Sequence, residues 1–273
     1  MLNHQTMDKL ASLRLEGMAQ ALEEQRRQSD ISQLDFEERF TLLVERQWLW
    51  REDRALSARL HYAQLKIAAC LEDIDYRHPR GLKRAQIEQL RASGWVGLHR
   101  NCLITGKTGC GKTYLACALG HQACRDGHRV CYYYAPKLFR ELHTAQADGS
   151  FTKLLKKLLR AGLLVIDDFG LPSVTGKQYR DLLEILDDRH GQGATLVTSQ
   201  FPVSQWHSQP LRPRLLFPYR LPPLIKQPVV LVGRISPPLF RRSGSLPPPP
   251  EFVPMQSHRL PKRLARRRVR MNQ

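Results

Sequence analysis

The sequence predicts an α/β fold in which a parallel sheet is flanked by helices and preceded by a helical N-terminal module. Three observations predict this fold. From residue 101 onward, short apolar segments typical of strands alternate with segments of helical periodicity. The strand-like segments are almost continuously apolar, which indicates a parallel sheet covered by helices on both faces. A glycine-rich segment separates the first of these strands from the first helix.

The N-terminal region, residues 1–70, is rich in leucine, glutamate, arginine and glutamine and contains no proline. Its first part predicts one amphipathic helix, because apolar residues recur at spacings of three to five. The residues concerned are Leu10, Leu13, Met18 and Leu22. Ser32, followed by Asp35, is expected to open a second helix that continues to about residue 68.

Residues 71–209 carry the predicted sheet, after a connector at 71–98. The strands are expected at 101–106, 129–134, 163–168 and 194–199. The helices are expected at 112–125, 136–149, 151–162 and 175–191. Residues 210–273 form a third region that is rich in proline and arginine and is expected to be disordered. Within it only the stretch QPVVLVGRI could form a strand.

The segment Gly106–Thr113, with the sequence GKTGCGKT, matches the G-x-x-x-x-G-K-[ST] phosphate-binding pattern. Its glycines allow the backbone to turn N–H groups onto phosphate oxygens, and the positive end of the next helix adds to this attraction. Lys112 is expected to reach the β- and γ-phosphates as a catalytic residue, and the Thr113 hydroxyl to ligate Mg²⁺. The predicted P-loop nucleotide-binding residues are Gly106, Lys107, Thr108, Gly109, Cys110, Gly111, Lys112 and Thr113. A glycine-rich turn without a ligand is the alternative.

Two acidic residues follow the third buried strand, at the end where an α/β sheet presents its ligands. Nucleotide hydrolysis needs a carboxylate for the metal ion and a base for the attacking water. We expect Asp167 to hold Mg²⁺ through water and Asp168 to activate the attacking water. Thr198, Ser199 and Gln200 end the last of the expected core strands, and Gln200 is expected to sense the γ-phosphate or to position the water. Ordinary strand-end turns are the alternative at both places.

The chain carries a formal net charge of +18, distributed unevenly. Residues 210–273 hold 14 lysines and arginines against Glu251 alone, so the rest of the chain is only mildly basic. The six cysteines lack C-x-x-C pairs, so they are expected to be small buried residues rather than metal ligands or disulfides. No apolar segment approaches the ~20 residues that span a membrane, and the first thirty residues lack the apolar centre of a signal peptide. A cytoplasmic protein without membrane contact is therefore expected.

Five stretches carry a resemblance to a known family. They are LASLRLEGMAQALEEQ, LEDIDYRHPRGLKRAQIEQL, GKTGCGKTYLACALGHQACRDGHRV, ADGSFTKLLKKLLRAGLLVIDDFGL and RDLLEILDDRHGQGATLVTSQFPVSQWH. They resemble the IstB-like AAA+ ATPases, relatives of the bacterial helicase loaders, over about residues 5–208. The resemblance implies an ATP- and Mg²⁺-binding helper of insertion-sequence transposition. Its implied partners are double-stranded DNA, the transposase of the same element and further copies of itself.

The same resemblance implies roles for two other regions. The DIDY segment would lie beside the adenine, with Ile74 and Tyr76 as candidates for the pocket wall. The N-terminal module would make partner or assembly contacts.

The chain departs from this family after Trp206 and His207. The family continues with a helix whose arginine reaches a neighbour's γ-phosphate and with a closing strand, whereas this sequence reads SQPLRPRLLFPYRLPPL. One interpretation is translation in a shifted reading frame, with loss of the arginine, of the closing strand and of hydrolysis. The other is a DNA-binding extension. Nothing aligns Arg212, Arg214 or Arg220 with the family's arginine.

Other functions stay open from the residues alone. They are a replicative helicase loader of the same fold, a small-molecule P-loop kinase, and a decayed copy that binds ATP without turnover. The LRLEGMAQALEEQ stretch favours transposition over helicase loading, and the double aspartate favours an ATPase over a kinase.

Single residues also leave alternatives. Arg189 could approach a neighbouring subunit's site or complement the dipole of its own helix. Trp48 and Trp50, two positions apart on a helix, are expected on different faces.

Overall fold

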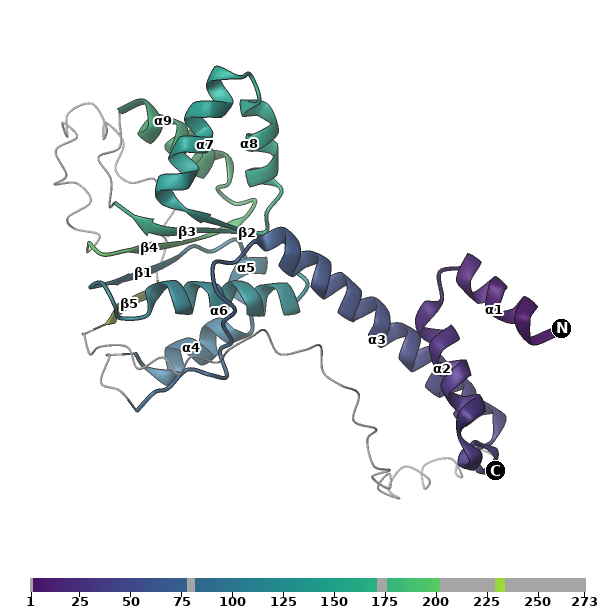
Figure 1. Cartoon of the computed structure of the whole chain (residues 1–273). Helices are drawn as coiled ribbons and strands as arrows, with labels where there is room; N and C mark the ends of the chain where they lie inside the picture. Colours follow the sequence, from purple (N-terminus) through teal and green to yellow (C-terminus); the bar gives the residue numbers. More distant parts are fainter. Residues whose placement is uncertain (1, 78–81, 171–175, 202–228, 234–273) are drawn as a thin grey trace, which may run out of the picture. The chain divides into compact units, whose positions relative to one another are not determined.

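The computed structural model describes residues 2–77, 82–170, 176–201 and 229–233. In these residues a parallel sheet has the strand order β2-β3-β4-β1-β5 (Figure 1). The strands are β1 (Cys102–Gly106), β2 (Val130–Tyr134), β3 (Leu163–Phe169), β4 (Ala194–Ser199) and β5 (Val229–Gly233). The predicted parallel sheet is confirmed, and β1 to β4 lie where the apolar segments indicated.

Helices cover both faces of the sheet (Figure 1). Strand residues alternate between two apolar clusters, because successive side chains on a strand point to opposite faces. Ile104 and Val165 face α6, while Leu103 and Leu164 face α7, α8 and α9. The helices are α6 (Lys112–Arg125), α7 (Ala135–Ala147), α8 (Phe151–Leu159) and α9 (Gly176–Asp188). The four predicted helices of the core are confirmed.

The N-terminal module begins with two helices instead of the single one predicted, α1 (Leu2–Ser12) and α2 (Glu16–Arg27). The break lies at Arg14, whose φ of 56° is left-handed and cannot continue a helix. After the break, α2 lies against α3 at Gly17. A Cβ at Gly17 would lie 2.7 Å from the Cβ of Trp50, so only glycine allows this approach. Apolar spacing alone does not reveal such a break.

The long helix α3 (Phe36–Ala63) does not begin at Ser32, as predicted, but after Asp35. Ser32 lies in the short 3-10 helix η1 (Ser29–Gln33). The Asp35 carboxylate accepts a hydrogen bond from the Glu38 N–H at 2.8 Å, and the Glu38 carboxylate accepts one from the Asp35 N–H at 3.1 Å. This reciprocal capping box satisfies two N–H groups at the start of the helix, which explains where it begins.

The connector at 71–98 contains two short helices that the sequence did not predict. They are α4 (Arg84–Arg91) and α5 (Gly94–Gly97). The buried side chains of Ile87 and Val96 join the cluster that also contains α6. The connector is therefore part of the core layer on that face of the sheet.

The outer edge of the sheet is formed by β5, which pairs in parallel with β1. This strand falls within QPVVLVGRI, the part of the tail in which a strand was considered. One of the two interpretations of the tail, a shifted reading frame, implied the loss of a closing strand; in the structure β5 occupies that edge. The rest of the tail, with Arg212, Arg214 and Arg220, lies outside the described residues, as does its expected disorder.

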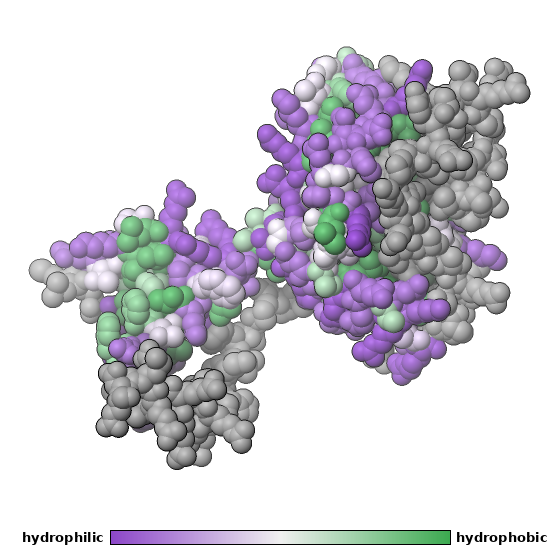
Figure 2. Space-filling model, turned by 180° about the vertical axis from the view of Figure 1, so that it is seen from behind, coloured by the Kyte–Doolittle hydropathy of each residue, from purple (hydrophilic) through white to green (hydrophobic). Residues whose placement is uncertain are grey.

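Large apolar side chains are exposed on α3 and, at Leu13, in the turn between α1 and α2 (Figure 2). They are Leu13, Phe36, Phe40, Leu42, Val44, Trp48 and Leu49. Trp48 is exposed whereas Trp50 lies against Gly17, so the two tryptophans face different ways, as predicted. None of the helices within the described ranges is both long and apolar enough to cross a membrane.

The cysteines follow the prediction in part. Buried cysteines are Cys102, Cys117, Cys124 and Cys131, whereas Cys70 and Cys110 are half-buried. Burial raises the pKa of the Cys102 thiol to about 12, so that it remains protonated and packs as an apolar residue.

Arg189 does not approach a neighbouring subunit's site, the first of the two roles considered for it. It directly follows α9, and its contacts include the Leu158 carbonyl in the last turn of α8, so a charge that complements a helix dipole stays a prediction. The Arg189 side chain is buried, and burial lowers the pKa of its guanidinium to about 10. The guanidinium donates to the backbone carbonyls of Leu158, Ala161 and Ala194 and to the Thr195 hydroxyl. Because Ala194 begins β4, these contacts lie at the amino end of the sheet, opposite the end where nucleotides bind in such folds.

Candidate nucleotide-binding site

The glycine-rich segment forms a loop between β1 and α6. Gly109 has a φ of 82° and Gly111 a φ of 91°, both in the left-handed region that glycine occupies readily. A Cβ at Gly109 would meet no atom within 4 Å, so the requirement there is conformational rather than spatial. Gly111 is the N-cap of α6, and the first N–H groups of that helix therefore open toward the loop. This arrangement suits an anion.

The first two residues of α6 place a cation and a hydroxyl beneath the loop. Lys112 is 7% exposed, and its Nζ donates to the Lys107 carbonyl at 3.1 Å. An ammonium carries three N–H donors, so two are available for phosphate oxygens. Thr113 directs its Oγ1 toward the end of β3. The exposed Lys107 and Thr108 form the outer part of the loop.

Asp167 is the fully buried centre of a hydroxyl cluster at the carboxyl end of the sheet. Thr113 Oγ1 donates to its Oδ2 at 2.9 Å, and Thr198 Oγ1 donates to its Oδ1 at 2.6 Å. The Tyr132 hydroxyl donates to Oδ2 at 2.7 Å. Three elements, β2, β4 and α6, thus direct one hydroxyl each at this carboxylate. A buried polar group without such hydrogen-bond partners would destabilise the fold.

Asp168 reaches the same edge through an irregularity in β3. The register between β3 and β4 shifts between Ile166 and Phe169, and Asp168 has a φ of 57°. Its N–H donates to Thr198 Oγ1 at 2.9 Å. A regular strand would turn two neighbouring side chains to opposite faces, so this bulge allows both aspartates to lie near the loop.

The environment of Asp168 changes its proton affinity. Burial raises the pKa of its carboxyl group, and the neighbouring Asp167 raises it further. Lys112, Lys66 and a hydrogen bond with the Gln200 side chain lower it by smaller amounts. A carboxylate with a raised pKa accepts a proton more readily than an ordinary aspartate, as a general base must.

Gln200 lies where β4 ends, between the loop and the aspartates. Its Oε1 accepts a hydrogen bond from Thr108 Oγ1 at 2.7 Å. The strand order places β4 between β3 and β1, so its carboxyl end stands between Asp168 and the loop. Gln200 therefore touches both the loop, at Thr108, and Asp168.

The oxygen donors of this site fit Mg²⁺. This ion is usually held by one or two carboxylates together with phosphates and water. The Thr113 hydroxyl and the Asp167 carboxylate are already neighbours at the start of α6. In the parts of the chain that the structure describes, no three acidic, histidine or cysteine side chains surround one point. A Mg²⁺ ion here would therefore depend on nucleotide phosphates for further ligands.

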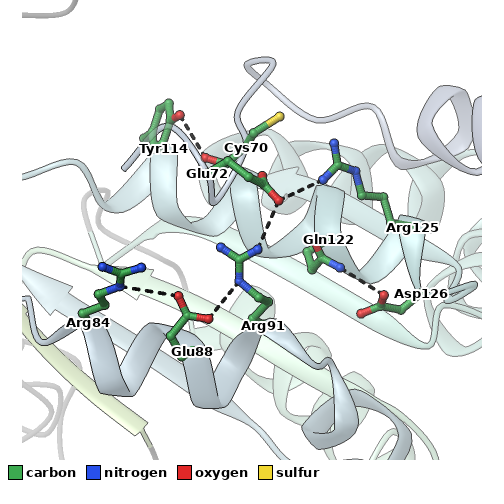
Figure 3. Close-up of polar contacts among 9 residues, drawn as sticks. All are labelled: Cys70, Glu72, Arg84, Glu88, Arg91, Tyr114, Gln122, Arg125 and Asp126. Atoms are coloured by element: carbon green, nitrogen blue, oxygen red, sulfur yellow. Dashed lines mark hydrogen bonds and ion pairs between the residues drawn. The ribbon is translucent and has the colours of Figure 1, made fainter. Parts of the chain in front are cut away.

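The segment before α4 carries Ile74 and Tyr76, the predicted adenine contacts. A network of charged side chains fixes this segment: Glu72 Oε1 accepts from Arg91 and from Arg125, each at 3.2 Å (Figure 3). Both predicted residues pack against the core cluster that contains α6. The Tyr76 hydroxyl is buried and has no hydrogen-bond partner among the described residues. Contact of this segment with adenine stays a prediction.

Two residues near the site were missed from the sequence. Tyr132 lies in the middle of an apolar strand and carries no motif, although a tyrosine in a buried strand needs a polar partner. Lys66 follows α3, and its charge acts on Asp168. Only the register of β2 beside β3 and the path of the chain after α3 bring these side chains to the site.

Solved structures show the same fold. The chain is similar to a DNA replication initiation factor with a TM-score of 0.50 and 19% identity, over 63% of this chain and 51% of that one. At this identity the likeness concerns the fold alone. The parallel sheet, the P-loop between β1 and α6 and the helical N-terminal region confirm the predicted fold class, a P-loop fold of the AAA+ type.

Some known sequences share a much higher identity with this chain than that solved structure does. The chain is 47% identical to an insertion sequence ATP-binding protein of Sinorhizobium fredii, over 76% of this chain and 84% of that protein. It is 43% identical to the ATP-binding protein of insertion sequence IS1162 of Pseudomonas fluorescens, over 78% and 93%. The family model described as IstB-like ATP binding protein matches residues 8–214. The chain therefore belongs to the family of IstB-like ATP-binding proteins.

Proposed function

We propose that this chain hydrolyses ATP with Mg²⁺ and acts as a helper of DNA transposition, assembling in several copies on double-stranded DNA and engaging the transposase of the same insertion sequence. The observation that carries this proposal is the hydroxyl cluster around Asp167. It brings the metal-binding residue types of an ATPase together under a phosphate-binding loop. The proposed reaction takes place in the cytoplasm.

Each residue of the site has a role in this reaction. The loop N–H groups and Lys112 bind the phosphates, while Thr113 and Asp167 hold Mg²⁺, the latter through water. When bound, Mg²⁺ neutralises the charge that develops on the phosphate oxygens. Asp168 takes a proton from the attacking water, whose oxygen forms the new bond to the γ-phosphorus as the bond to ADP breaks. Gln200 positions that water.

A basic cavity supports the DNA-binding part of the proposal. It has a volume of about 1250 Å³ and lies between α7 and α8, beside the end of α3. Its cationic lining residues are Arg129, Lys137, Arg140, Lys153, Lys156, Lys157 and Arg160, against Glu141 and Asp148. Figure 2 shows hydrophilic side chains over much of the described surface of the core. Such an excess of cations fits the phosphate backbone of DNA, without recognition of bases.

Helical spacing explains how the cations gather. Residues three, four or seven apart on a helix share one face. Lys137 and Arg140 are spaced in this way on α7, and Lys153 and Lys156 on α8, with Arg160 as the C-cap of that helix. The apolar residues between them face the sheet, so both helices direct charge into the same cavity.

The cavity and the nucleotide site meet at β2. Lys157 Nζ donates to the Tyr133 hydroxyl at 2.9 Å on one face of this strand. On the other face, the Tyr132 hydroxyl donates to Asp167. Adjacent residues of β2 thus contact a lysine that lines the cavity and the carboxylate of Asp167. This supports a dependence of hydrolysis on DNA.

The relatives favour transposition over the alternatives. The relatives from Sinorhizobium fredii and Pseudomonas fluorescens are both named as ATP-binding proteins of insertion sequences. A helicase loader shares the fold and would be distinguished by capture of a replicative helicase instead of a transposase. A decayed copy would bind ATP without turnover.

Duplex binding stimulated by ATP is the expected result for the wild-type chain. Lys112→Ala should weaken ATP binding at least tenfold and abolish the stimulation, because the phosphates lose their buried cation. Fluorescence anisotropy of labelled duplex DNA with and without ATP and Mg²⁺ measures this. Lys83→Ala, an exposed lysine before α4, is the matched control. Equal duplex binding with and without ATP in the wild type would contradict the proposal.

Removing cations from the cavity should reduce the salt dependence of duplex binding. The double variant Lys153→Ala, Lys156→Ala is expected to make the negative slope of log K against log salt shallower by about 1.8. This is ~0.9 for each DNA phosphate that the chain no longer neutralises. The double variant Lys83→Ala, Arg100→Ala removes two exposed cations outside the cavity and should leave the slope unchanged. Equal slopes for the two variants would exclude the cavity as the DNA-binding surface.

A further inference from the structure

The segment that follows α3 packs against α6, the helix after the P-loop. Ala63 ends α3 and is fully buried, and Gln64 follows with a φ of 50°, which turns the backbone sharply. Leu65 then lies against Gly120 of α6, where a Cβ would come within 3.1 Å of Leu65 Cδ2. Glycine at this position lets the segment pass close to the helix. The segment that carries Lys66 therefore has a defined place.

Cys117 holds the backbone of this segment. Burial raises the pKa of its thiol, and hydrogen bonds with the backbone of Ile67 and Lys66 oppose that effect. Cys117 lies four residues after Thr113, which places it one turn further along the same face of α6. Lys66 is therefore anchored beside the turn of α6 that carries the phosphate-binding residues.

The side chain of Lys66 extends toward the carboxyl end of the sheet. Its Nζ lies 5.3 Å from the centroid of the Tyr134 ring, and Tyr134 ends β2 directly beside Asp167 of β3. The ammonium therefore lies beside the carboxyl ends of β2 and β3, and Asp168 is the next residue of β3 after Asp167. Lys66 is exposed, so its flexible chain is free to move toward a ligand.

We propose that Lys66 is a second phosphate-binding cation of this site, which contacts the terminal phosphate of ATP. The inference rests on the proposed function, because it requires ATP to bind the loop. The water that Asp168 activates must lie against the γ-phosphorus, so a cation beside Asp168 also lies beside the γ-phosphate. Lys112 is buried beneath the loop, whereas Lys66 approaches from the side of β2. A lysine contacts phosphate as a point charge.

A contact between Lys66 and the γ-phosphate predicts that the chain distinguishes ATP from ADP, because ADP lacks that phosphate. Lys66→Ala should weaken binding of a non-hydrolysable ATP analogue with Mg²⁺ about tenfold while leaving ADP affinity unchanged. Lys66→Arg keeps the charge and should retain most of the preference for the analogue. Lys112→Ala should weaken both nucleotides, because it removes a cation that contacts the β-phosphate as well. Isothermal titration calorimetry of the four proteins measures all these affinities.

The outcomes separate this inference from the proposed function. If the wild type binds the analogue and Lys66→Ala binds both nucleotides with wild-type affinity, the role of Lys66 is overturned and the proposed function is not. That role is also overturned if Lys66→Ala weakens the analogue and ADP equally, since an equal loss indicates a structural effect. Wild type that binds neither nucleotide overturns the proposed function and this inference together.

Discussion

Asp168→Asn is expected to abolish ATP hydrolysis while ATP binding is retained. The substitution removes the proton acceptor beside the loop, and loss of a general base typically costs 10²- to 10⁴-fold in rate. Asparagine has the same shape and tolerates the left-handed φ of 57° found at this residue, so the backbone of the bulge should persist. Asp167 and its three hydroxyl partners stay in place for Mg²⁺. Phosphate release under saturating ATP and nucleotide titration measure the two quantities.

A matched control is available on α9. Asp187 is exposed and lies far along the chain from the loop, so Asp187→Asn should hydrolyse ATP at the wild-type rate. If Asp168→Asn retained more than a tenth of the wild-type rate, another group would have to activate the water. A wild-type chain that binds ATP but releases no phosphate, even with duplex DNA, would instead identify the decayed copy.

Arg189→Met is expected to cause the largest loss of stability. Methionine fills the space but withdraws the guanidinium donors from the Leu158, Ala161 and Ala194 carbonyls, of which the Leu158 carbonyl still accepts from the Ala161 N–H at 3.3 Å. An unsatisfied buried acceptor costs about 1–3 kcal/mol, and release of the cost of burying a charge offsets part of this. A net loss on the order of 3 kcal/mol in the free energy of unfolding corresponds to roughly 6–12 °C in Tm. Thermal unfolding by circular dichroism measures it.

Two further variants test the cause. Arg180 is exposed on α9, the helix that precedes Arg189, and Arg180→Met should change the free energy of unfolding by less than about 0.5 kcal/mol. Gly193→Ala introduces a Cβ 2.8 Å from Arg189 Nη2 and should destabilise the chain through the same contacts. ATP hydrolysis by the folded fraction of Arg189→Met should be unchanged, because the guanidinium lies at the amino end of the sheet. A normal Tm with lost hydrolysis would show that Arg189 belongs to the site after all.

The elements of the core could be predicted because each is encoded locally. The strand at 194–199 and the helix at 112–125 have the predicted bounds, since apolar runs and a glycine N-cap mark them directly. The N-terminal helices were harder. The break at Arg14 and the start of α3 after Asp35 depend on a single backbone angle and on one pair of reciprocal hydrogen bonds. Neither feature alters the apolar periodicity.

The sequence by itself determined the phosphate-binding loop and the two aspartates. Positive φ angles at Gly109 and Gly111 are local properties, and the polar pair Asp167 and Asp168 at the end of an apolar run marks the carboxyl end of β3. Only the tertiary structure decided which side chains meet there. Tyr132 and Lys66 reach the aspartates because β2 pairs with β3 and because the chain after α3 crosses α6. The pairing of strands and the crossing of one segment over a helix depend on packing between residues far apart in sequence. A local sequence pattern does not predict that packing.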